Sequence, residues 1–223
     1  MRWWLACLTF AAALGAELED ARDRQDRAAL EKTIAAWSAP KPDDAAAHYR
    51  LALAWSYLAE VSEELRDRAQ VKRAAEAGIR AAERAVALKP EVAEHHRILG
   101  TLCGQIIPAN VIAALGYGKQ AQESISRAIE RDPKSDRAWV SRGVGNYYLP
   151  QALGGGYEKA IADFRRAIEL NPKSDQAWLW LGLALRRTGN NAEARQALEK
   201  SLALNPRRVW TKQQLAKTPP GAQ

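Results

Sequence analysis

A proline that returns in the same sequence context constrains the fold of this chain more than any other feature. Pro133 and Pro172 are each followed by the same string, Lys-Ser-Asp-x-Ala-Trp, and Pro206 ends a third segment of the same design. Eight residues before each of these prolines stands a large apolar residue, in turn Ile125, Phe164 and Leu198. Such self-similarity indicates one supersecondary unit that is copied along the chain.

The last copy shows what the unit is, because Pro172 and Pro206 are 34 residues apart. Trp178, Leu181 and Leu185 fall on one face of a helix, and Gly182 between them allows a neighbouring helix to approach closely. A Gly-Asn-Asn turn at 189–191 follows, and then a second helix with its own apolar stripe. Pro206 ends this helix, since proline cannot continue a helix interior. The unit is therefore predicted to be a pair of antiparallel helices.

This unit resembles the tetratricopeptide repeat (TPR), which has the same period and the same Trp-x2-Leu-Gly-x2-Leu pattern. The resemblance covers roughly residues 28 to 215 and implies an all-α solenoid of antiparallel helix pairs. Earlier copies are longer: the prolines that end successive units are 39 residues apart before Pro172, 43 before Pro133 and 48 before Pro90. The first three repeats therefore carry inserts, which are also similar to those of the microtubule-dynamics-regulator family and of the T-component of some bacterial solute transporters.

These patterns divide the chain into predicted segments. Residues 17–42 form an N-terminal helix, the second half of an incomplete repeat, and residues 43–217 form the solenoid with a short capping helix that ends near Lys217. Residues 218–223, which include Pro219-Pro220-Gly221, are expected to be a frayed tail. The repeats are predicted at about 43–90, 91–133, 134–172 and 173–206.

The first sixteen residues differ from the rest. Arg2 precedes an apolar stretch, small residues follow at 11–16, and charge begins abruptly at Glu17. This order is typical of a cleaved secretory signal peptide, and we expect a periplasmic or secreted protein. An uncleaved membrane anchor is the alternative, although a comfortable helical span needs about 20 residues.

Export would change which roles the cysteines and the net positive charge can have. Cleavage would leave Cys103 alone, so no internal disulfide could form, and its place in the helical pattern indicates a buried, inert thiol. The formal net charge is +7, but acids and bases alternate along the helices, as in 63–68. With export, this pattern argues against a nucleic-acid partner.

The TPR resemblance implies that the first helix of each repeat lines a concave face that binds a protein or peptide. Tyrosine and arginine suit such a face, because tyrosine has few rotamers to freeze and arginine forks onto carboxylates. Capture of a terminal carboxylate is not expected, because Tyr49 and Leu53 stand where the family's Lys and Asn would be needed. A second possibility for Tyr147 and Tyr148 is that they pack against the insert that follows them. The predicted partner-binding residues are Tyr49, Tyr57, Arg97, Arg137, Val144, Tyr147, Tyr148, Leu183, Arg186 and Arg187.

The three inserts are expected along one edge of the solenoid, since each lies between the two helices of its repeat. The first, 56–73, lacks Gly and Pro and is predicted to lengthen both helices. The second, 104–118, is apolar, and the third, 147–157, is a glycine-rich loop framed by tyrosines. They form either a small satellite core or an exposed patch for a ligand, a partner or a lipid surface.

No residue pattern indicates catalysis. The glycines at 154–156 lack the Lys-Ser/Thr ending of a phosphate loop, and the neighbours His95 and His96 point to different helix faces, so no metal site is expected. The sequence thus predicts a non-enzymatic scaffold of the cell envelope without a cofactor, binding a protein or peptide on its concave face. A small-molecule carrier that uses the inserts, as the transporter likeness implies, is the alternative; peripheral membrane contact is a third possibility, and the oligomeric state is not predicted.

Overall fold

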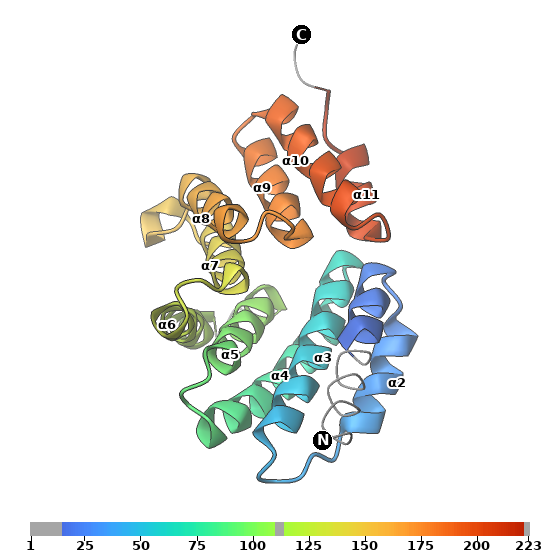
Figure 1. Ribbon diagram of the computed structural model, residues 1–223, viewed down its shortest axis with the longest axis vertical. Helices are drawn as coiled ribbons and strands as arrows, with labels where there is room; N and C mark the ends of the chain where they lie inside the picture. The colour runs from blue at the N-terminus through green and yellow to red at the C-terminus, as the bar shows by residue number, and fades with distance from the viewer. Residues whose placement is uncertain (1–14, 110–113, 221–223) are drawn as a thin grey trace, which may run out of the picture.

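A computed structural model describes residues 15–109 and 114–220, and these residues form helices and turns without a β-strand (Figure 1). The helices follow one another as antiparallel pairs, so the predicted all-α TPR solenoid is confirmed. Residues 15–23 are the first described helix. The later elements are α2 (Arg27–Trp37), α3 (Ala45–Glu64), α4 (Arg68–Leu88), α5 (Ala93–Ile106), η1 (Ile107–Ala109), α6 (Ala114–Arg131), α7 (Asp136–Tyr148), η2 (Gln151–Leu153), α8 (Tyr157–Leu170), α9 (Asp175–Arg187), α10 (Asn191–Leu204) and α11 (Val209–Ala216).

The four repeats correspond to the pairs α3/α4, α5/α6, α7/α8 and α9/α10. Side-chain caps begin several of these helices: Asp44 accepts from the backbone N–H of Ala47, and Asp67 accepts from that of Gln70. The first insert lengthens its two helices to 20 and 21 residues, as its lack of Gly and Pro predicts. The sequence therefore sets both the ends and the lengths of these pairs.

Close packing within the pairs α5/α6 and α9/α10 depends on a glycine in the first helix of each. A Cβ atom at Gly182 would lie 2.7 Å from Cγ of Leu198 and 2.9 Å from the carbonyl oxygen of Ala194. A Cβ atom at Gly100 would lie 2.7 Å from Cγ1 of Ile125. All three distances are shorter than van der Waals contact, so the close approach predicted at Gly182 is confirmed.

The buried apolar side chains form two separate cores. The first core extends from Leu18 in the N-terminal helix to Ile106 in α5. The second core extends from Val140 in α7 to Leu198 in α10. The solenoid is thus two apolar halves that are joined through the region where α5 and α6 meet α7.

The N-terminal segment differs from the prediction of a single helix in an incomplete repeat. Residues 15–23 and α2 are two helices, and they form a further pair. Leu18 is 2% exposed and Ala21 is 8% exposed, so the first of these helices belongs to the core although its sequence is rich in charge. The predicted signal peptide, 1–16, falls almost entirely on residues outside the described ones.

The C-terminal segment is also more ordered than predicted. The capping helix α11 ends at Ala216, close to the expected end at Lys217. Thr218, which was predicted to lie in a frayed tail, is 2% exposed and its hydroxyl donates to the carbonyl of Gln214. The order extends at least to this residue because Arg186 and Arg195 bind the chain here.

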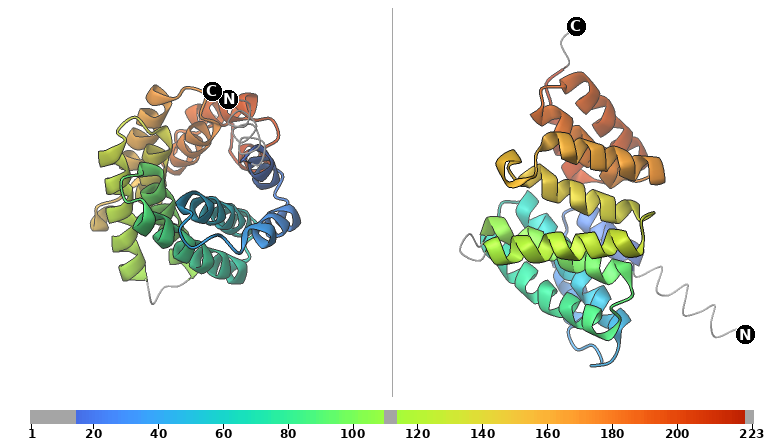
Figure 2. Two further views of the ribbon diagram at one scale, coloured as in Figure 1. Left: turned by 60° about the horizontal axis from the view of Figure 1, so that its bottom comes forward. Right: turned by 90° about the vertical axis from the view of Figure 1, so that its left-hand side faces the viewer.

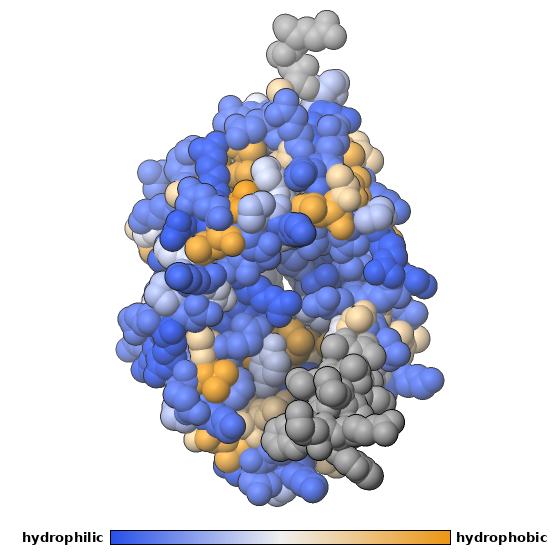
Figure 3. Space-filling model, viewed as in Figure 1, coloured by the Kyte–Doolittle hydropathy of each residue, from blue (hydrophilic) through white to orange (hydrophobic). Residues whose placement is uncertain are grey.

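The pairs coil so tightly that the two ends of the solenoid meet. Figure 2 (left) shows the helices around a ring, with the C-terminal helices beside the N-terminal ones. The space-filling view shows a hollow at the centre of the molecule, between the half that holds α3 to α5 and the half that holds α9 to α11 (Figure 3). The first helices of the repeats therefore line the inside of the ring, and we call this surface the inner wall.

Candidate functional site

The inner wall carries a cluster built around an acid that the sequence analysis did not single out, Glu94 at the start of α5. The hydroxyl of Tyr49 donates to Oε1 of Glu94 at 2.9 Å. Arg97 donates two hydrogen bonds to the same carboxylate, at 2.7 Å to Oε2 and 2.6 Å to Oε1. Arg137, from α7, approaches Oε1 of Glu94 at 3.8 Å and Oε1 of Glu19 at 3.5 Å. Three predicted partner-binding residues thus meet at one point, which we call the Glu94 cluster: Tyr49, Glu94, Arg97 and Arg137.

The charges within the Glu94 cluster are fixed by their neighbours. Burial alone would raise the pKa of Glu94, but the Arg97 guanidinium and the hydrogen bonds from Arg97 and Tyr49 together lower it. Burial and the Glu94 charge raise the pKa of Tyr49, so its hydroxyl remains a donor. Arg97 is buried and already satisfied, whereas the Arg137 side chain is 55% exposed and its ion pairs are long. Arg137 is therefore the basic member of the cluster that its neighbours hold least tightly.

Tyr57 lies next along α3 and is covered rather than open. Its side chain is 8% exposed, and the Arg22 guanidinium lies 4.8 Å from its ring centroid. Arg22 is itself held by hydrogen bonds to Asp23 at 2.9 and 2.6 Å. The N-terminal helix thus shields this predicted partner-binding residue from solvent.

Farther along the inner wall, aromatic side chains from α7, α8, α9 and α11 pack edge to face. The Tyr147 ring centroid lies 5.0 Å from that of Tyr148, 5.3 Å from that of Tyr157 and 5.6 Å from that of Trp180. Trp180 also contacts Trp210, with centroids 5.5 Å apart. Such edge-to-face pairs add to the energy of apolar burial. We call this group the aromatic cluster: Tyr147, Tyr148, Tyr157, Trp180 and Trp210.

The members of the aromatic cluster differ in exposure. Trp180 is 9% exposed, but Tyr148 is 58% exposed at the end of α7. Arg187 donates to the Tyr157 hydroxyl at 3.0 and 2.7 Å, and its guanidinium lies 5.2 Å from the centre of that ring. Tyr147 therefore packs against Tyr157 of the insert, as the second of the two predictions has it, whereas Tyr148 is exposed.

The remaining predicted residues serve the second core and the C-terminal helix. Val144 packs against the second core and Leu183 is 3% exposed within it. Arg186 donates to the Gln214 carbonyl at 3.2 Å, to the Gln214 side chain at 2.9 Å and to the Thr218 hydroxyl at 3.2 Å. The structure thus separates these three residues from the open part of the wall.

Sequence reasoning missed Glu94, Trp180 and Trp210. Trp180 left a signal: it stands two residues after Trp178, and residues two apart point to nearly opposite faces of a helix, so both cannot belong to one stripe. Glu94 left a weak signal, because Arg97 follows it by three residues on the same helix, and Trp210 left none, because its partner Trp180 belongs to a distant element.

The histidines and the cysteine have structural roles, as predicted. The rings of His95 and His96 hydrogen-bond to the carbonyl oxygens of Ala85 and Pro90, at 3.0 and 2.7 Å. Cys103 is fully buried, which raises the pKa of its thiol to about 12. Among the described residues, no group of His, Cys, Asp and Glu side chains could hold a metal ion.

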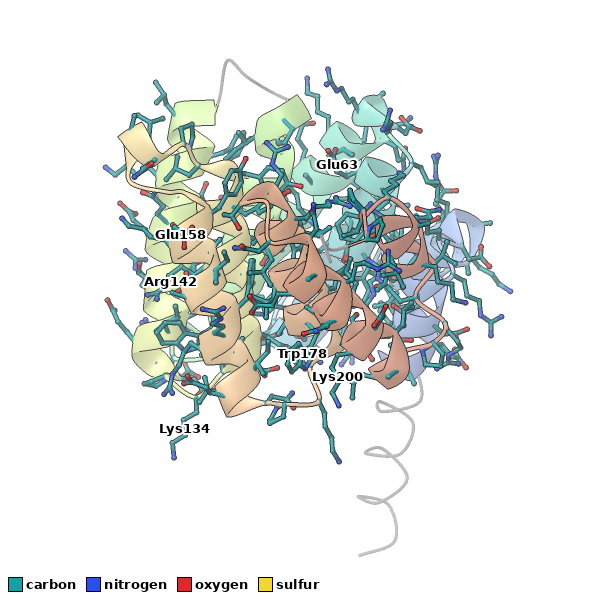
Figure 4. All side chains as sticks on the ribbon, turned by 90° about the horizontal axis from the view of Figure 1, so that it is seen from above. Glu63, Lys134, Arg142, Glu158, Trp178 and Lys200 are labelled. Atoms are coloured by element: carbon teal, nitrogen blue, oxygen red, sulfur yellow. The ribbon has the colours of Figure 1, made fainter. Side chains whose placement is uncertain are left out.

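The inserts lie along one edge of the solenoid. In Figure 4 Glu63 and Glu158 mark the edge at which the helices of a repeat turn back, whereas Lys134, Trp178 and Lys200 lie toward the opposite edge. Within the described part of the chain, the exposed large apolar side chains all lie toward the first edge. Leu65, Leu115 and Leu153 belong to the connections between helices or lie beside them, whereas Tyr148 is the last residue of α7 and ends the inner wall there. Leu115 and Leu153 are 91% and 68% exposed, so they join no satellite core; residues 110–113, in the middle of the second insert, are outside the described residues.

Two surface hollows lie away from the predicted residues. One, of about 400 Å³, is lined by Ile34, Trp55, Leu58 and Arg73 among others from α2, α3 and α4. The other, of about 330 Å³, is formed by the turn 189–193. No helix in the described part of the chain is both long and apolar enough to cross a bilayer.

Comparison with known structures shows the same fold elsewhere. A thermophilic TPR protein of Thermus thermophilus is 18% identical, with a TM-score of 0.61 over 86% of this chain and 88% of that one. The HusA haemophore of Porphyromonas gingivalis is also 18% identical, with a TM-score of 0.62 over 80% of this chain and 94% of that one. No curated protein matches the chain.

Comparison with protein families gives two matches that follow each other along the chain. Residues 154–208 match the tetratricopeptide repeat. Residues 14–152, more than half of the chain, match the family described as regulator of microtubule dynamics protein 1-3. By these matches the chain is a tetratricopeptide-repeat protein and belongs to the regulator of microtubule dynamics protein 1-3 family.

Proposed function

We propose that this protein is a non-enzymatic scaffold that holds a protein or peptide partner on the inner wall of the solenoid. The observation that carries the proposal is the exposure of Arg137 and Tyr148 beside two preformed clusters. The Glu94 cluster and the aromatic cluster hold their other members in place, so little side-chain freedom is lost when a partner binds.

The chemistry of this wall favours a partner with an acidic group and an apolar or aromatic group. Arg137 offers a guanidinium that can fork onto a carboxylate, and Tyr148 offers an open ring face. The family description refers to microtubule dynamics, and this fits a role in contacting protein assemblies. Arginine and tyrosine are also common among the residues that dominate the binding energy of protein interfaces.

The test compares single variants of the full chain as baits for partner capture. We expect Arg137→Ala and Tyr148→Ala each to weaken capture about tenfold or more, since truncation of a dominant contact costs about 2 kcal/mol. Lys134→Ala is the matched control, because Lys134 is exposed at the edge of the solenoid opposite the inserts and is not a predicted partner-binding residue. Equal capture by all three variants, with circular dichroism showing intact helices, would remove the inner wall from consideration.

The insert edge is a second candidate surface, favoured by the exposure of Leu115 and Leu153. A small-molecule carrier, the alternative expected from the sequence, would use this edge. The double variant Leu115→Ser/Leu153→Ser separates the two surfaces. If this variant no longer captures the partner while Arg137→Ala still does, the binding site lies on the inserts.

We also propose that the protein is exported and that cleavage occurs after Ala16. The proposal rests on the apolar stretch before the charged residues from Glu17 onward. N-terminal sequencing of protein recovered from the producing cells is the test. A chain that begins at Glu17 supports cleavage and export, and a chain that retains Met1 contradicts cleavage.

A further inference from the structure

The two ends of the solenoid meet around one fully buried side chain, Arg208, just before α11. Arg208 is 0% exposed. Its guanidinium donates to Glu60 at 2.7 Å, to the Glu64 carboxylate, and to the backbone carbonyl of Arg22 at 3.2 Å. Glu60 and Glu64 belong to α3, so this residue connects the C-terminal end of the chain to the first half of the molecule.

Further polar contacts surround Arg208. The side-chain amide of Asn205 donates to Asp23 at 2.7 Å and to Asp175 at 2.9 Å. Arg207 forms an ion pair with Asp20 at 2.8 Å. The contacts with Asp23 and Asp20 bind the turn between α10 and α11 to the helix 15–23, and the contact with Asp175 binds it to α9; all of them are polar.

The other junction between the two halves also contains a polar contact. Where α5 meets α7, the hydroxyls of Thr101 and Ser141 lie 3.0 Å apart, and the two apolar cores stop on either side. Separating an apolar core exposes hydrophobic surface to water, whereas separating charged groups returns them to a solvent that hydrates them well. The junction near α7 is also held by the chain itself, which continues from α6 to α7, whereas no chain connection joins the two ends. The contact between the two ends is therefore the place where this ring can open at least cost.

We propose that the contacts of Arg208 with Glu60, Glu64 and the Arg22 carbonyl form a latch that holds the two halves as a closed ring and controls access to the inner wall. Helix 15–23, α3 and Tyr57 share the first core, so opening the latch leaves them together and moves the C-terminal end of the chain, with α11, away from them. The ring thereby widens around its inner wall. That a protein or peptide partner enters the opened ring rests on the proposed function, but the latch itself does not.

The test measures the distance between the halves in solution. Spin labels are placed at Lys32→Cys on α2 and Lys200→Cys on α10, both exposed positions, in a full chain with Cys7→Ala and Cys103→Ala. We expect Arg208→Met to lengthen the mean distance in pulsed electron resonance and to broaden its distribution. Arg207→Met is the matched control: it is the next residue, its side chain is 63% exposed, and we expect the parent distance.

A second variant keeps the test decisive if Arg208→Met does not fold. Glu60→Gln preserves shape and leaves Arg208 paired with Glu64, so we expect a smaller lengthening of the same kind. Far-UV circular dichroism establishes that each labelled chain is helical. Parent distances in both Arg208→Met and Glu60→Gln, or in Glu60→Gln alone where Arg208→Met is unfolded, would overturn the latch.

Partner capture by the same chains separates this inference from the proposed function. Lengthened distances without any captured partner would support the latch and count against the scaffold. Unchanged distances with a partner that depends on Arg137 would support the scaffold and overturn the latch.

Discussion

At the scale of single residues, the fold shifts the ionisation of Glu64 into a pH range where its effect on stability can be measured. Its side chain is 2% exposed, and burial raises its pKa to about 7 in spite of the attraction of Arg208. Glu60 adds repulsion, and Asp23 and Arg22 complete the charged groups around Arg208. The folded state therefore binds a proton at Glu64 more tightly than the unfolded state, in which the pKa lies near its ordinary value of 4.5.

The sign of the resulting pH dependence follows directly. The contribution of Glu64 to stability is fully present below about pH 4.5 and is lost as the pH rises toward 7. We expect wild-type protein to lose more stability than Glu64→Gln between about pH 5 and about pH 8, by a few kcal/mol at most, since a tenfold change in proton affinity is about 1.4 kcal/mol. Urea unfolding of both proteins at the two pH values measures this difference. Parallel pH profiles would show that Glu64 does not titrate in this range.

At the scale of helices, the repeats depend on close contact within each pair. We expect Gly182→Ala to destabilise the protein by about 1–2 kcal/mol, because the new methyl group meets Leu198 and the Ala194 carbonyl. Gly145→Ala is the matched control: Gly145 lies in α7 with nothing within 4 Å of the added Cβ, so the change should stabilise by about 0.5–1 kcal/mol. Urea unfolding measures both, and a stabilising Gly182→Ala would refute the close-contact account.

The capping helix α11 has eight residues, too few to be stable in isolation. Arg186 holds it through Gln214 and Thr218. We expect Arg186→Ala to speed amide hydrogen exchange in α11, while Arg187→Ala, which removes contacts with Tyr157 only, leaves that helix unchanged. The same exchange rate in α11 for both variants would mean that the contacts of Arg186 do not hold it.

Local signals made these elements predictable from the sequence, and the same signals explain what was missed. Pro172 and Pro206 end helices by chemistry that acts within one turn, and Gly182 reports a contact within one repeat. In the sequence, Arg208 resembles a solvated charge near a proline. Its partners in α3 reach it only because the curvature of four successive repeats brings the two ends of the chain together. Glu94 escaped notice for a similar reason: its carboxylate gains meaning only when Tyr49 and Arg137 arrive from neighbouring repeats.

At the scale of the whole molecule, the division into two cores predicts independent responses to damage. Leu198→Ala removes a fully buried side chain from the second core, which costs about 2–5 kcal/mol. We expect faster amide exchange in α8, α9 and α10, with protection in α3 and α4 retained, because stability in repeat proteins is carried by near neighbours. Leu102→Ala, in the first core, should give the reverse pattern. Uniform acceleration in either variant would indicate a single cooperative unit.

The position of Arg208 in the chain also sets an order of events during folding. Its contacts join residues 144 to 186 positions apart, whereas the contacts within a repeat and between neighbouring repeats are much more local. Closing so long a loop carries an entropy cost that local pairs avoid, and chains fold from the N-terminal side during synthesis. The first core can therefore assemble on the nascent chain while its acidic side chains Glu60 and Glu64 still face water. They lose that hydration only when residue 208 has been made, so ring closure is the final step of maturation.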